Sequence, residues 1–385
     1  MKTWTSLVLL LCSISASAQE AGIPVGGLQV YPLFGAALGY NDNVARRNDD
    51  PVSSEFLLLE PGIRADLAGS RQLFRAQYQI SHAEFFSSRR DDYTDHLLDL
   101  SWRYTPTVRS DLMLAARWHR AHDPRGLGLR ENFLETLDRD VDEFDDQGFD
   151  LRYTHGAERA RGRVALFAGA GDKTYRNNRD FTREGDHHYL SYGAEFDWRF
   201  ASRTSLLALA RWSEADFDVG VRDSSSRELG FGLAWEGNTG DARVVAGRIR
   251  RDLDDPLQTD FSGTFWEAAA TWRPADRSQL TVATRRATDA AFGQANFLVR
   301  EDLTLGWRHQ WASRLGSSVD LGWAEESFEP GGRSDDIRRY GLSVDYTFRR
   351  WLQLGFGWRH TERNSSTDAF SFEANEMLLS AQVSL

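Results

Sequence analysis

The sequence has almost no cysteine, very little lysine and no long apolar run. The sole cysteine, Cys12, lies in a short apolar segment near the start, so disulfide bonds are not expected to hold the rest of the chain together. No stretch approaches the roughly 18 consecutive apolar residues that a membrane helix requires, which excludes a helical membrane protein. The net charge of −11 argues against a nucleic-acid partner, whose phosphates would require a basic face.

Positive charge comes almost entirely from arginine, because lysine occurs only at Lys2 and Lys173. A GC-rich coding sequence would produce this bias. A selected preference for the planar, forked donors of arginine would produce it as well.

The first residues have the order of a secretory signal peptide. Lys2 precedes the apolar segment 6–14, "SLVLLLCSI", which is followed by the small residues "ASA" at 16–18. We therefore expect cleavage after Ala18. A lipoprotein is disfavoured because Leu11, rather than a small residue, precedes Cys12.

Apolar residues fall on alternate positions through most of the chain, a pattern that predicts β-strands. The segments 190–200 and 352–359 show it clearly, and in a third segment one face carries Tyr340, Leu342, Val344, Tyr346 and Phe348. The alternation lasts about 9–13 residues, whereas soluble strands typically run about 5–6, and it fits a tilted strand that crosses a bilayer. The sequence therefore predicts an all-β protein, a transmembrane antiparallel up-and-down β-barrel.

The connections between these segments alternate between short and long. The short ones lie near Ala68, Pro106, Gly156, Ala201, Asn238, Pro274, Ala312 and Phe348. The longer, polar ones include 122–147, 176–186 and 325–336. Short periplasmic turns and long extracellular loops are typical of barrels in the outer membrane of Gram-negative bacteria.

Counting hairpins gives the expected organisation of the chain. Eight hairpins, a first strand near 30–40 and a last strand near 370–385 make about 18 strands. An even number places both ends on the periplasmic side. We expect a signal peptide over 1–18, a short periplasmic segment over 19–29 and an outer-membrane barrel over 30–385.

Many hairpins carry an aromatic residue just before the short turn. Rings that recur at one depth in successive strands are selected by a membrane interface. The expected interface aromatics are Trp102, Trp198, Trp235, Trp272, Trp307 and Tyr346.

Once the apolar face is assigned to lipid, the opposite parity predicts which charges line the lumen. The arginines are Arg75, Arg117, Arg163, Arg199, Arg211, Arg248, Arg273, Arg285, Arg308 and Arg359. The acidic residues are Glu60, Asp66, Asp99, Asp150, Glu195, Asp197, Glu228, Glu267, Asp302, Asp320 and Asp345. A barrel of about 16–18 strands is too wide for side chains to fill, so we expect these groups to face water or a substrate.

Two roles are open for the lumen charges. Cross-strand ion pairs would simply keep the wall hydrated. Alternatively, arginine forks, together with aromatics such as Tyr189 at the lumen edge, would offer repeated weak sites for the hydroxyls and carboxylates of a sliding polymer. The mixture of signs argues against a strongly anion-selective pore.

Enzymatic and metal-dependent functions find little support. His187 and His188 point in opposite directions on a strand, and neither they nor His360 accompany a nucleophile elbow or zinc spacing. The acidic stretch 138–146 is not an EF-hand, because Glu143 stands where the loop requires glycine. We expect no enzyme activity, no cofactor and no metal site.

The stretch 38–50, "LGYNDNVARRNDD", marks the end of the first strand. Its Asn and Asp side chains can bond their own backbone to start a turn, which we favour over a metal site. The run Tyr40, Asn41, Asp42, Asn43, Val44 resembles the Tyr-(Asn/Asp)-Asp-Asn-Val pattern of the putative β-barrel porin 2 family of outer-membrane proteins. Members are often associated with exopolysaccharide or capsule gene clusters, so the resemblance implies a polysaccharide-export channel.

The last predicted strand is similar to the C-terminal signal strand of outer-membrane barrels, although Leu385 stands in place of the usual terminal aromatic. This resemblance implies that the barrel-assembly machinery acts as a partner during insertion. Outer-membrane lipid and lipopolysaccharide are the other expected partners.

The leading functional hypothesis is a passive conduit that exports an exopolysaccharide or capsular polysaccharide. The chain has no phosphate-binding glycine loop, so transport would be driven elsewhere, together with separate periplasmic export components. A general or substrate-selective diffusion porin is the first alternative, and a surface enzyme or adhesion barrel is the second.

Overall fold

The computed structural model describes residues 22–132, 136–219, 222–255, 258–291 and 295–384. The predicted signal peptide and its cleavage point after Ala18 lie outside these residues. Within the described part, no helix is long and apolar enough to cross a membrane.

In the described residues, nineteen strands make up nearly all of the regular structure. The first ten are β1 (Ile23–Val25), β2 (Leu28–Asn41), β3 (Ser54–Ala68), β4 (Gln72–Phe85), β5 (Tyr93–Thr107), β6 (Ser110–Asp123), β7 (Asp142–His155), β8 (Gly162–Tyr175), β9 (His187–Ala201) and β10 (Thr204–Phe217). The other nine are β11 (Ser224–Glu236), β12 (Gly240–Leu253), β13 (Phe261–Ala275), β14 (Ser278–Ala290), β15 (Phe297–Ala312), β16 (Leu315–Glu329), β17 (Ser334–Arg349), β18 (Leu352–Ser365) and β19 (Phe372–Ser384). The short helices of the described residues are η2 (Arg89–Asp91), η3 (Gly128–Asn132), α1 (Arg179–Thr182), η5 (Arg183–Gly185) and η6 (Asp368–Phe370).

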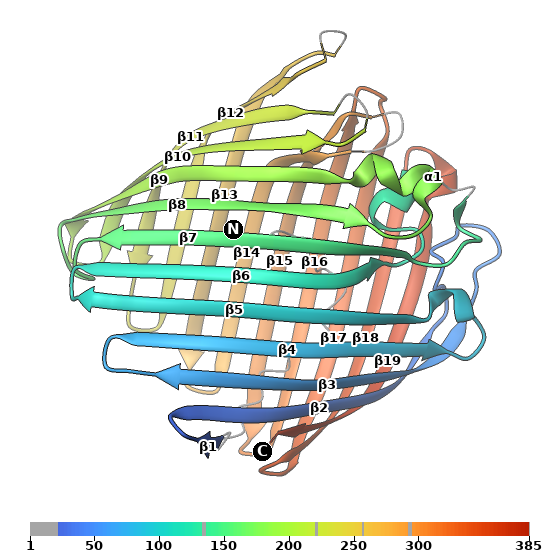
Figure 1. Cartoon of the computed structure of the whole chain (residues 1–385), viewed down its shortest axis with the longest axis horizontal. Helices are drawn as coiled ribbons and strands as arrows, with labels where there is room; N and C mark the ends of the chain where they lie inside the picture. Colours follow the sequence, from blue (N-terminus) through green and yellow to red (C-terminus); the bar gives the residue numbers. More distant parts are fainter. Residues whose placement is uncertain (1–21, 133–135, 220–221, 256–257, 292–294, 385) are drawn as a thin grey trace.

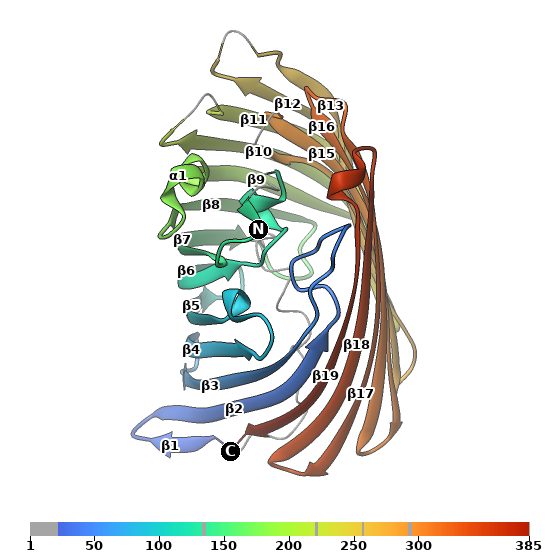
Figure 2. The same cartoon turned by 90° about the vertical axis from the view of Figure 1, so that its right-hand side faces the viewer.

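Strands β2 to β19 form one closed antiparallel barrel of 18 strands, as the sequence predicted. Each strand pairs with its neighbours along the chain, and β19 pairs with β2 to close the ring. In Figure 1 the strands of the near wall cross those of the far wall, as expected when both walls of a barrel tilt by roughly 40°. Figure 2 shows the barrel edge-on, with β4 to β9 in one wall and β15 to β18 in the other.

The connections agree with the predicted alternation. Each of the eight predicted short turns joins two consecutive strands, and the longer connections all leave from the opposite end of the barrel. The start of the chain differs from prediction. The first barrel strand begins at Leu28 rather than near Val30, and part of the expected periplasmic segment forms β1, which pairs with β2 through Ile23 and Val30.

Each barrel strand presents an apolar face to the outside. On β11 the side chains of Leu229 and Phe231 are 59% and 78% exposed, which suits lipid as the surrounding solvent. On the neighbouring β12, Val245 has the opposite direction and is fully buried inside. The outward face is therefore continuous with the membrane, whereas the inward face is not uniformly polar.

Inward apolar residues gather at the two edges where the walls meet. One cluster joins Leu207, Leu209, Val245, Ile249 and Phe265 of β10, β12 and β13. The other joins Ala37, Phe56, Leu58, Ala83 and Leu378 of β2, β3, β4 and β19. At each edge the inward side chains converge and exclude water, so the open part of the lumen is confined to the middle.

The residues of the Tyr40–Val44 pattern fasten the closing seam of the barrel. The Asp42 carboxylate accepts hydrogen bonds from the backbone nitrogen and side-chain nitrogen of Asn375 at 2.6 and 2.8 Å. The Asn43 side chain donates to the carbonyl of Glu373 at 2.8 Å. Its backbone nitrogen donates to the Asn41 side chain at 2.8 Å, which is the local turn that the sequence suggested. This stretch therefore ties the first barrel strand to the last.

We predict that Asp42→Ala weakens the seam. The substitution removes two acceptors from Asn375 near the outer end of β19, which should lower the free energy of unfolding by about 1–3 kcal/mol. Urea unfolding in lipid vesicles, followed by tryptophan fluorescence, measures the change. Asp49→Ala, at an exposed position of the same connection, is the matched control. Equal unfolding midpoints for the two variants would contradict the proposed role of Asp42.

Candidate functional site: the lumen and its mouth

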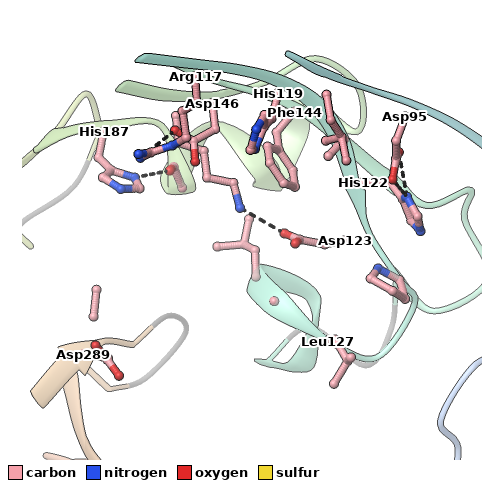
Figure 3. A pocket seen from close by; sticks show the side chains of 18 of the residues that line it. Asp95, Arg117, His119, His122, Asp123, Leu127, Phe144, Asp146, His187 and Asp289 are labelled. Carbon is pink, nitrogen blue, oxygen red and sulfur yellow. Dashed lines mark hydrogen bonds and ion pairs between the residues drawn. The ribbon is translucent and has the colours of Figure 1, made fainter. Parts of the chain in front are cut away.

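A cavity of about 1570 Å³ lies between the two walls and opens toward the long connections. Arginine and acidic side chains from both walls line it, together with residues of the β6–β7 connection, 124–141. Figure 3 shows Arg117, His119 and Asp146 on one side of this space and Asp289 of β14 on the other. We call the end of the barrel with the long connections the mouth, and the long connections that fold into the lumen there the mouth connections. Because they occupy part of the lumen, the cavity is narrower than the barrel itself (Figure 2).

Nine of the ten arginines predicted for the lumen point inward. They are Arg75, Arg117, Arg163, Arg199, Arg211, Arg273, Arg285, Arg308 and Arg359, each with the same parity as a lumen residue on its strand. Glu195, Asp197 and Asp345 also point inward. Of these twelve side chains, only Arg117, Arg211, Arg285 and Glu195 line the cavity itself.

The prediction for Arg248 is wrong. Arg248 lies opposite Leu229 of β11 and Thr264 of β13, on the outward face of β12, and it is exposed. On this strand Val245 and Ile249 face inward, where they fill one edge of the barrel. Both faces of β12 thus carry apolar residues, so the rule that assigns the apolar face to lipid could not choose between them.

The predicted interface aromatics lie outward, close to the short turns. Trp235 and Trp272 are 42% and 56% exposed, at the ends of β11 and β13. The indole of Trp102 stacks on Tyr104, with 5.4 Å between ring centroids. Trp198, Trp307 and Tyr346 occupy corresponding places on β9, β15 and β17.

Several carboxylates of the β5–β9 wall are paired with cations. The Arg117 guanidinium lies 3.4 Å from both Asp146 and Asp150, and it contacts the Tyr189 hydroxyl. The side chain of Lys173 lies 3.3 Å from Asp123 and above the ring of Phe144. These pairs balance part of the charge on this wall.

Glu195, which faces the middle of the lumen from the same wall, is paired as well. Its carboxylate lies 2.7 Å from Arg243 and 3.6 Å from Arg152. Arg211 of β10 is held in turn by Glu228 and Glu267, at 2.8 and 2.9 Å. These pairs are the cross-strand ladder that the sequence suggested as one role of the lumen charges.

The opposite wall carries five inward arginines that lie near the cavity. We call Arg285, Arg300, Arg339, Arg359 and Arg363, from β14, β15, β17 and β18, the rear-wall arginines. Arg300 pairs with Glu326 at 2.6 Å. By contrast, no ion pair or hydrogen bond joins the guanidinium of Arg285 or Arg339 to any other residue of the described ranges.

The rear-wall arginines lie within electrostatic reach of one another. The charge of Arg339 interacts with those of Arg300, Arg359 and Arg363. Like charges gathered in a partly dehydrated space repel, and an anion placed among them relieves that repulsion. The carboxylates of Glu326 and Asp302 also lie among these arginines, and Arg285 and Arg339 are the two that no direct ion pair engages in the described residues.

The Arg46 guanidinium, from the β2–β3 connection (42–53), extends this basic region to the mouth. It donates to the carbonyls of Val44 and Arg125 at 3.4 and 3.0 Å. Burial lowers the pKa of Arg46 to about 10, while the negative charges of Glu376 and Asp91 oppose the shift. Arg46 thus remains charged at neutral pH.

Two buried arginines hold the β6–β7 connection inside the mouth. Arg125 donates from Nε to Asp91 at 2.8 Å and from Nη1 to the carbonyl of Leu137 at 3.0 Å. It also donates to the hydroxyl of Ser88 at 2.8 Å. Arg125 therefore links the β6–β7 connection to the β4–β5 connection that contains η2.

Arg130 is fully buried and uses all five of its donors. Two bonds reach the Asp142 carboxylate, and the other three reach the carbonyls of Thr136, Arg139 and Asp140. The connection thus folds around one guanidinium. Asp142, which belongs to the acidic stretch 138–146, serves as its counter-ion.

Several of these residues were missed by the sequence analysis. Strand parity could have identified Arg300, Arg339 and Arg363, because each shares a face with small or polar neighbours on its strand. Arg125 and Arg130 lie in a connection without periodicity. No pattern in the sequence marks them as buried.

The closed barrel, the outward aromatic residues and the charged lumen define an outer-membrane β-barrel porin. The chain belongs to the family described as "Putative beta-barrel porin 2", whose model matches residues 16–385 and confirms the resemblance seen in the sequence. No curated protein matches the chain.

Solved porin structures share the fold. One is OpdK of Pseudomonas aeruginosa with vanillate, with a TM-score of 0.53 and 12% identity over 92% of this chain and 99% of that chain. Another is a BenF-like porin of Pseudomonas fluorescens, with a TM-score of 0.53 and 11% identity over 94% of this chain and 100% of that chain. OccK2 of P. aeruginosa in complex with glucuronate has a TM-score of 0.50 and 12% identity, covering 93% and 98% of the two chains.

We predict that Arg130→Gln releases the β6–β7 connection from the lumen. Removing the guanidinium leaves Asp142 as an uncompensated buried charge, a change that costs about 3–5 kcal/mol. Single-channel recordings in planar bilayers should therefore show a larger and noisier conductance. Arg139→Gln, which breaks the exposed pair with Asp180 and the contact of Arg139 with the Phe181 ring, should conduct like the parent. A parental conductance for Arg130→Gln would show that the connection does not limit the pore.

Proposed function

We propose that this porin is a substrate-selective diffusion channel for small solutes that carry a carboxylate. The single observation that carries the proposal is the pair Arg285 and Arg339, which face the lumen without an ion-pair partner in the described part of the chain. Guanidinium forks match carboxylates through two parallel hydrogen bonds. The favourable interaction of a negative solute with the rear-wall arginines would therefore offset the hydration free energy that the solute loses in the lumen.

The opposite wall would orient such a solute. Arg117, Lys173 and Arg243 are each held by a carboxylate, so these three cations would compete little for the anion. A solute would pass from Arg46 at the mouth to Arg339 and Arg285, exchanging one weak site for the next. Several weak sites permit both entry and exit, which conduction requires.

The export hypothesis has less support than this diffusion reading. The mouth connections fill part of the lumen, and the buried bonds of Arg125 and Arg130 hold them there. A polymer would have to displace them. The bound molecules named for two porins of the same fold, vanillate and glucuronate, are small carboxylates, and this likeness favours solutes of that class.

We predict that Arg285→Gln combined with Arg339→Gln reduces carboxylate passage. Two guanidiniums would be lost from a hydrated space, where each contributes about 1 kcal/mol, so glucuronate flux into proteoliposomes should fall about fivefold or more. Flux of a neutral sugar of similar size should change less than about twofold, because it gains little from these charges.

Arg338→Gln is the matched control, because Arg338 neighbours Arg339 in sequence but points outward from β17 and pairs with Glu362. It should behave like the parent. Equal losses of glucuronate and neutral-sugar flux in the double variant would indicate a damaged pore and would contradict carboxylate selection.

A chromosomal deletion separates diffusion from export. We expect the deletion strain to take up glucuronate or vanillate more slowly as sole carbon source, while the amount of polysaccharide outside the cell stays unchanged. Loss of extracellular polysaccharide with parental uptake would overturn the diffusion proposal and favour export.

A further inference from the structure

Four arginines lie on the outside of the barrel, on three strands of the segment from β11 to β14. We call Arg227, Arg248, Arg250 and Arg286, from β11, β12 and β14, the outer-wall arginines. Arg227 and Arg250 are direct cross-strand partners, and Arg248 lies two residues from Arg250 on the same face. The set is independent of the lumen, since all four side chains have outward parity.

Thr264 of β13 connects the two halves of this set. It is the cross-strand partner of Arg248, and its hydroxyl accepts a hydrogen bond from Nη1 of Arg286 at 2.8 Å. The Arg286 guanidinium also lies over the ring of Trp266, 5.7 Å from its centroid. The arginines, Thr264 and Trp266 thus form one continuous outward surface.

The acids on this surface do not match all the cations. Asp252 lies 2.5 Å from Arg250 and 3.5 Å from Arg227, and Arg250 also lies 3.4 Å from Asp260. Glu301 holds Arg286 at 2.7 Å. Arg248 forms no ion pair or hydrogen bond with the rest of the described chain.

The four arginines face three acids, so one cation of this surface has no counter-ion within the described residues. Like charges that face each other across a strand pair destabilise a sheet, and a guanidinium on the lipid face is costly at membrane depth. Arg248 lies beside Leu229, whose side chain is 59% exposed on the lipid face. A charged headgroup at this height would supply the missing counter-ion.

The position of the cluster indicates which leaflet would supply it. The outer-wall arginines lie toward the ends of their strands that lead into the long connections, because β12 ends at Leu253 and β11 begins at Ser224. Long connections are extracellular in outer-membrane barrels. Next to the cluster the outward face is acidic, since Glu301, Glu325 and Asp336 are successive cross-strand partners. An anionic headgroup would therefore be drawn to β11–β14 and repelled by β15–β17.

We propose that the outer-wall arginines bind a phosphate of a phosphorylated glycolipid in the outer leaflet. Arg248 and Arg250 would donate to the phosphate oxygens, and Arg227 would share its charge between the phosphate and Asp252. Guanidinium–phosphate bonds are among the strong charge-assisted hydrogen bonds of proteins. The site orients the barrel with this face toward a bound lipid and leaves the lumen unchanged.

The test uses the full chain refolded into phosphatidylcholine vesicles that contain one added lipid. The added lipid is diphosphorylated lipid A, dephosphorylated lipid A with the same acyl chains, or phosphatidylglycerol. After mild detergent extraction and gel filtration, mass spectrometry measures the added lipid that stays with the protein. We expect retention of diphosphorylated lipid A only. Equal retention of dephosphorylated lipid A would overturn a phosphate site, and equal retention of phosphatidylglycerol would overturn the assignment to a glycolipid.

Variants assign the binding to these residues. Arg248→Gln combined with Arg250→Gln should lower retention of diphosphorylated lipid A about threefold or more, because two charge-assisted bonds are lost. The corresponding double lysine variant should keep most of it. Arg338→Gln, an outward arginine on the other wall, should retain as much as the parent.

Folding of every variant is checked by heat-modifiable migration on gels. If the double glutamine variant does not fold, Arg248→Gln alone carries the test, since this exposed side chain has no described partner to lose. Parental retention by a folded Arg248→Gln, Arg250→Gln or double variant would overturn the proposal.

Discussion

The structure depends on one constraint, which is that lipid cannot hydrogen-bond the backbone. Every strand in the membrane must therefore have two neighbours, and the sheet must close. The seam between β2 and β19 is where chain ends that are far apart in sequence complete this requirement, through nine cross-strand pairs from Asn41–Glu376 to Leu33–Ser384. Asp42 and Asn43 add side-chain bonds to β19 at its outer end. The Tyr40–Val44 pattern of the family is thus explained by its role in closing the barrel, rather than by the binding of a ligand.

Closure into a flattened ring determines where polar and apolar residues can face inward. At the two edges the walls approach each other, and side chains such as Phe265 and Phe56 pack together without water. Between the edges the walls are too far apart for side chains to meet, so the inward charges there keep their hydration or pair locally. The cavity of about 1570 Å³ is the space that remains after the mouth connections fold in. The shape of the ring therefore concentrates the rear-wall arginines in a narrow passage.

Much of the fold could be predicted from the sequence, because the period of two and the turn residues are local signals. The short turns, the strand number and the inward direction of residues such as Arg117 and Arg285 follow from them. The same rule failed at Arg248, because it assumes that only one face of a strand is apolar, whereas β12 packs Val245 and Ile249 against an edge of the ring. Buried charges in the connections could not be predicted either. Arg130 is buried only because distant parts of one loop fold around it, and no local pattern encodes that contact.

Arginine serves three different environments in this protein, and lysine would serve none of them equally. Inside the mouth, Arg130 distributes five bonds among one carboxylate and three carbonyls, more than the three donors of an ammonium allow. In the lumen, Arg339 presents a weakly hydrated fork to a passing anion. On the outer wall, Arg286 bonds Thr264 and Glu301 while lying over Trp266. A GC-rich coding sequence would favour arginine at all positions alike. It does not explain why these side chains form several hydrogen bonds that only a planar guanidinium group can make together. The scarcity of lysine is consistent with selection for that geometry, and the buried Lys173, with one carboxylate and two aromatic rings as partners, is the position where a point charge suffices.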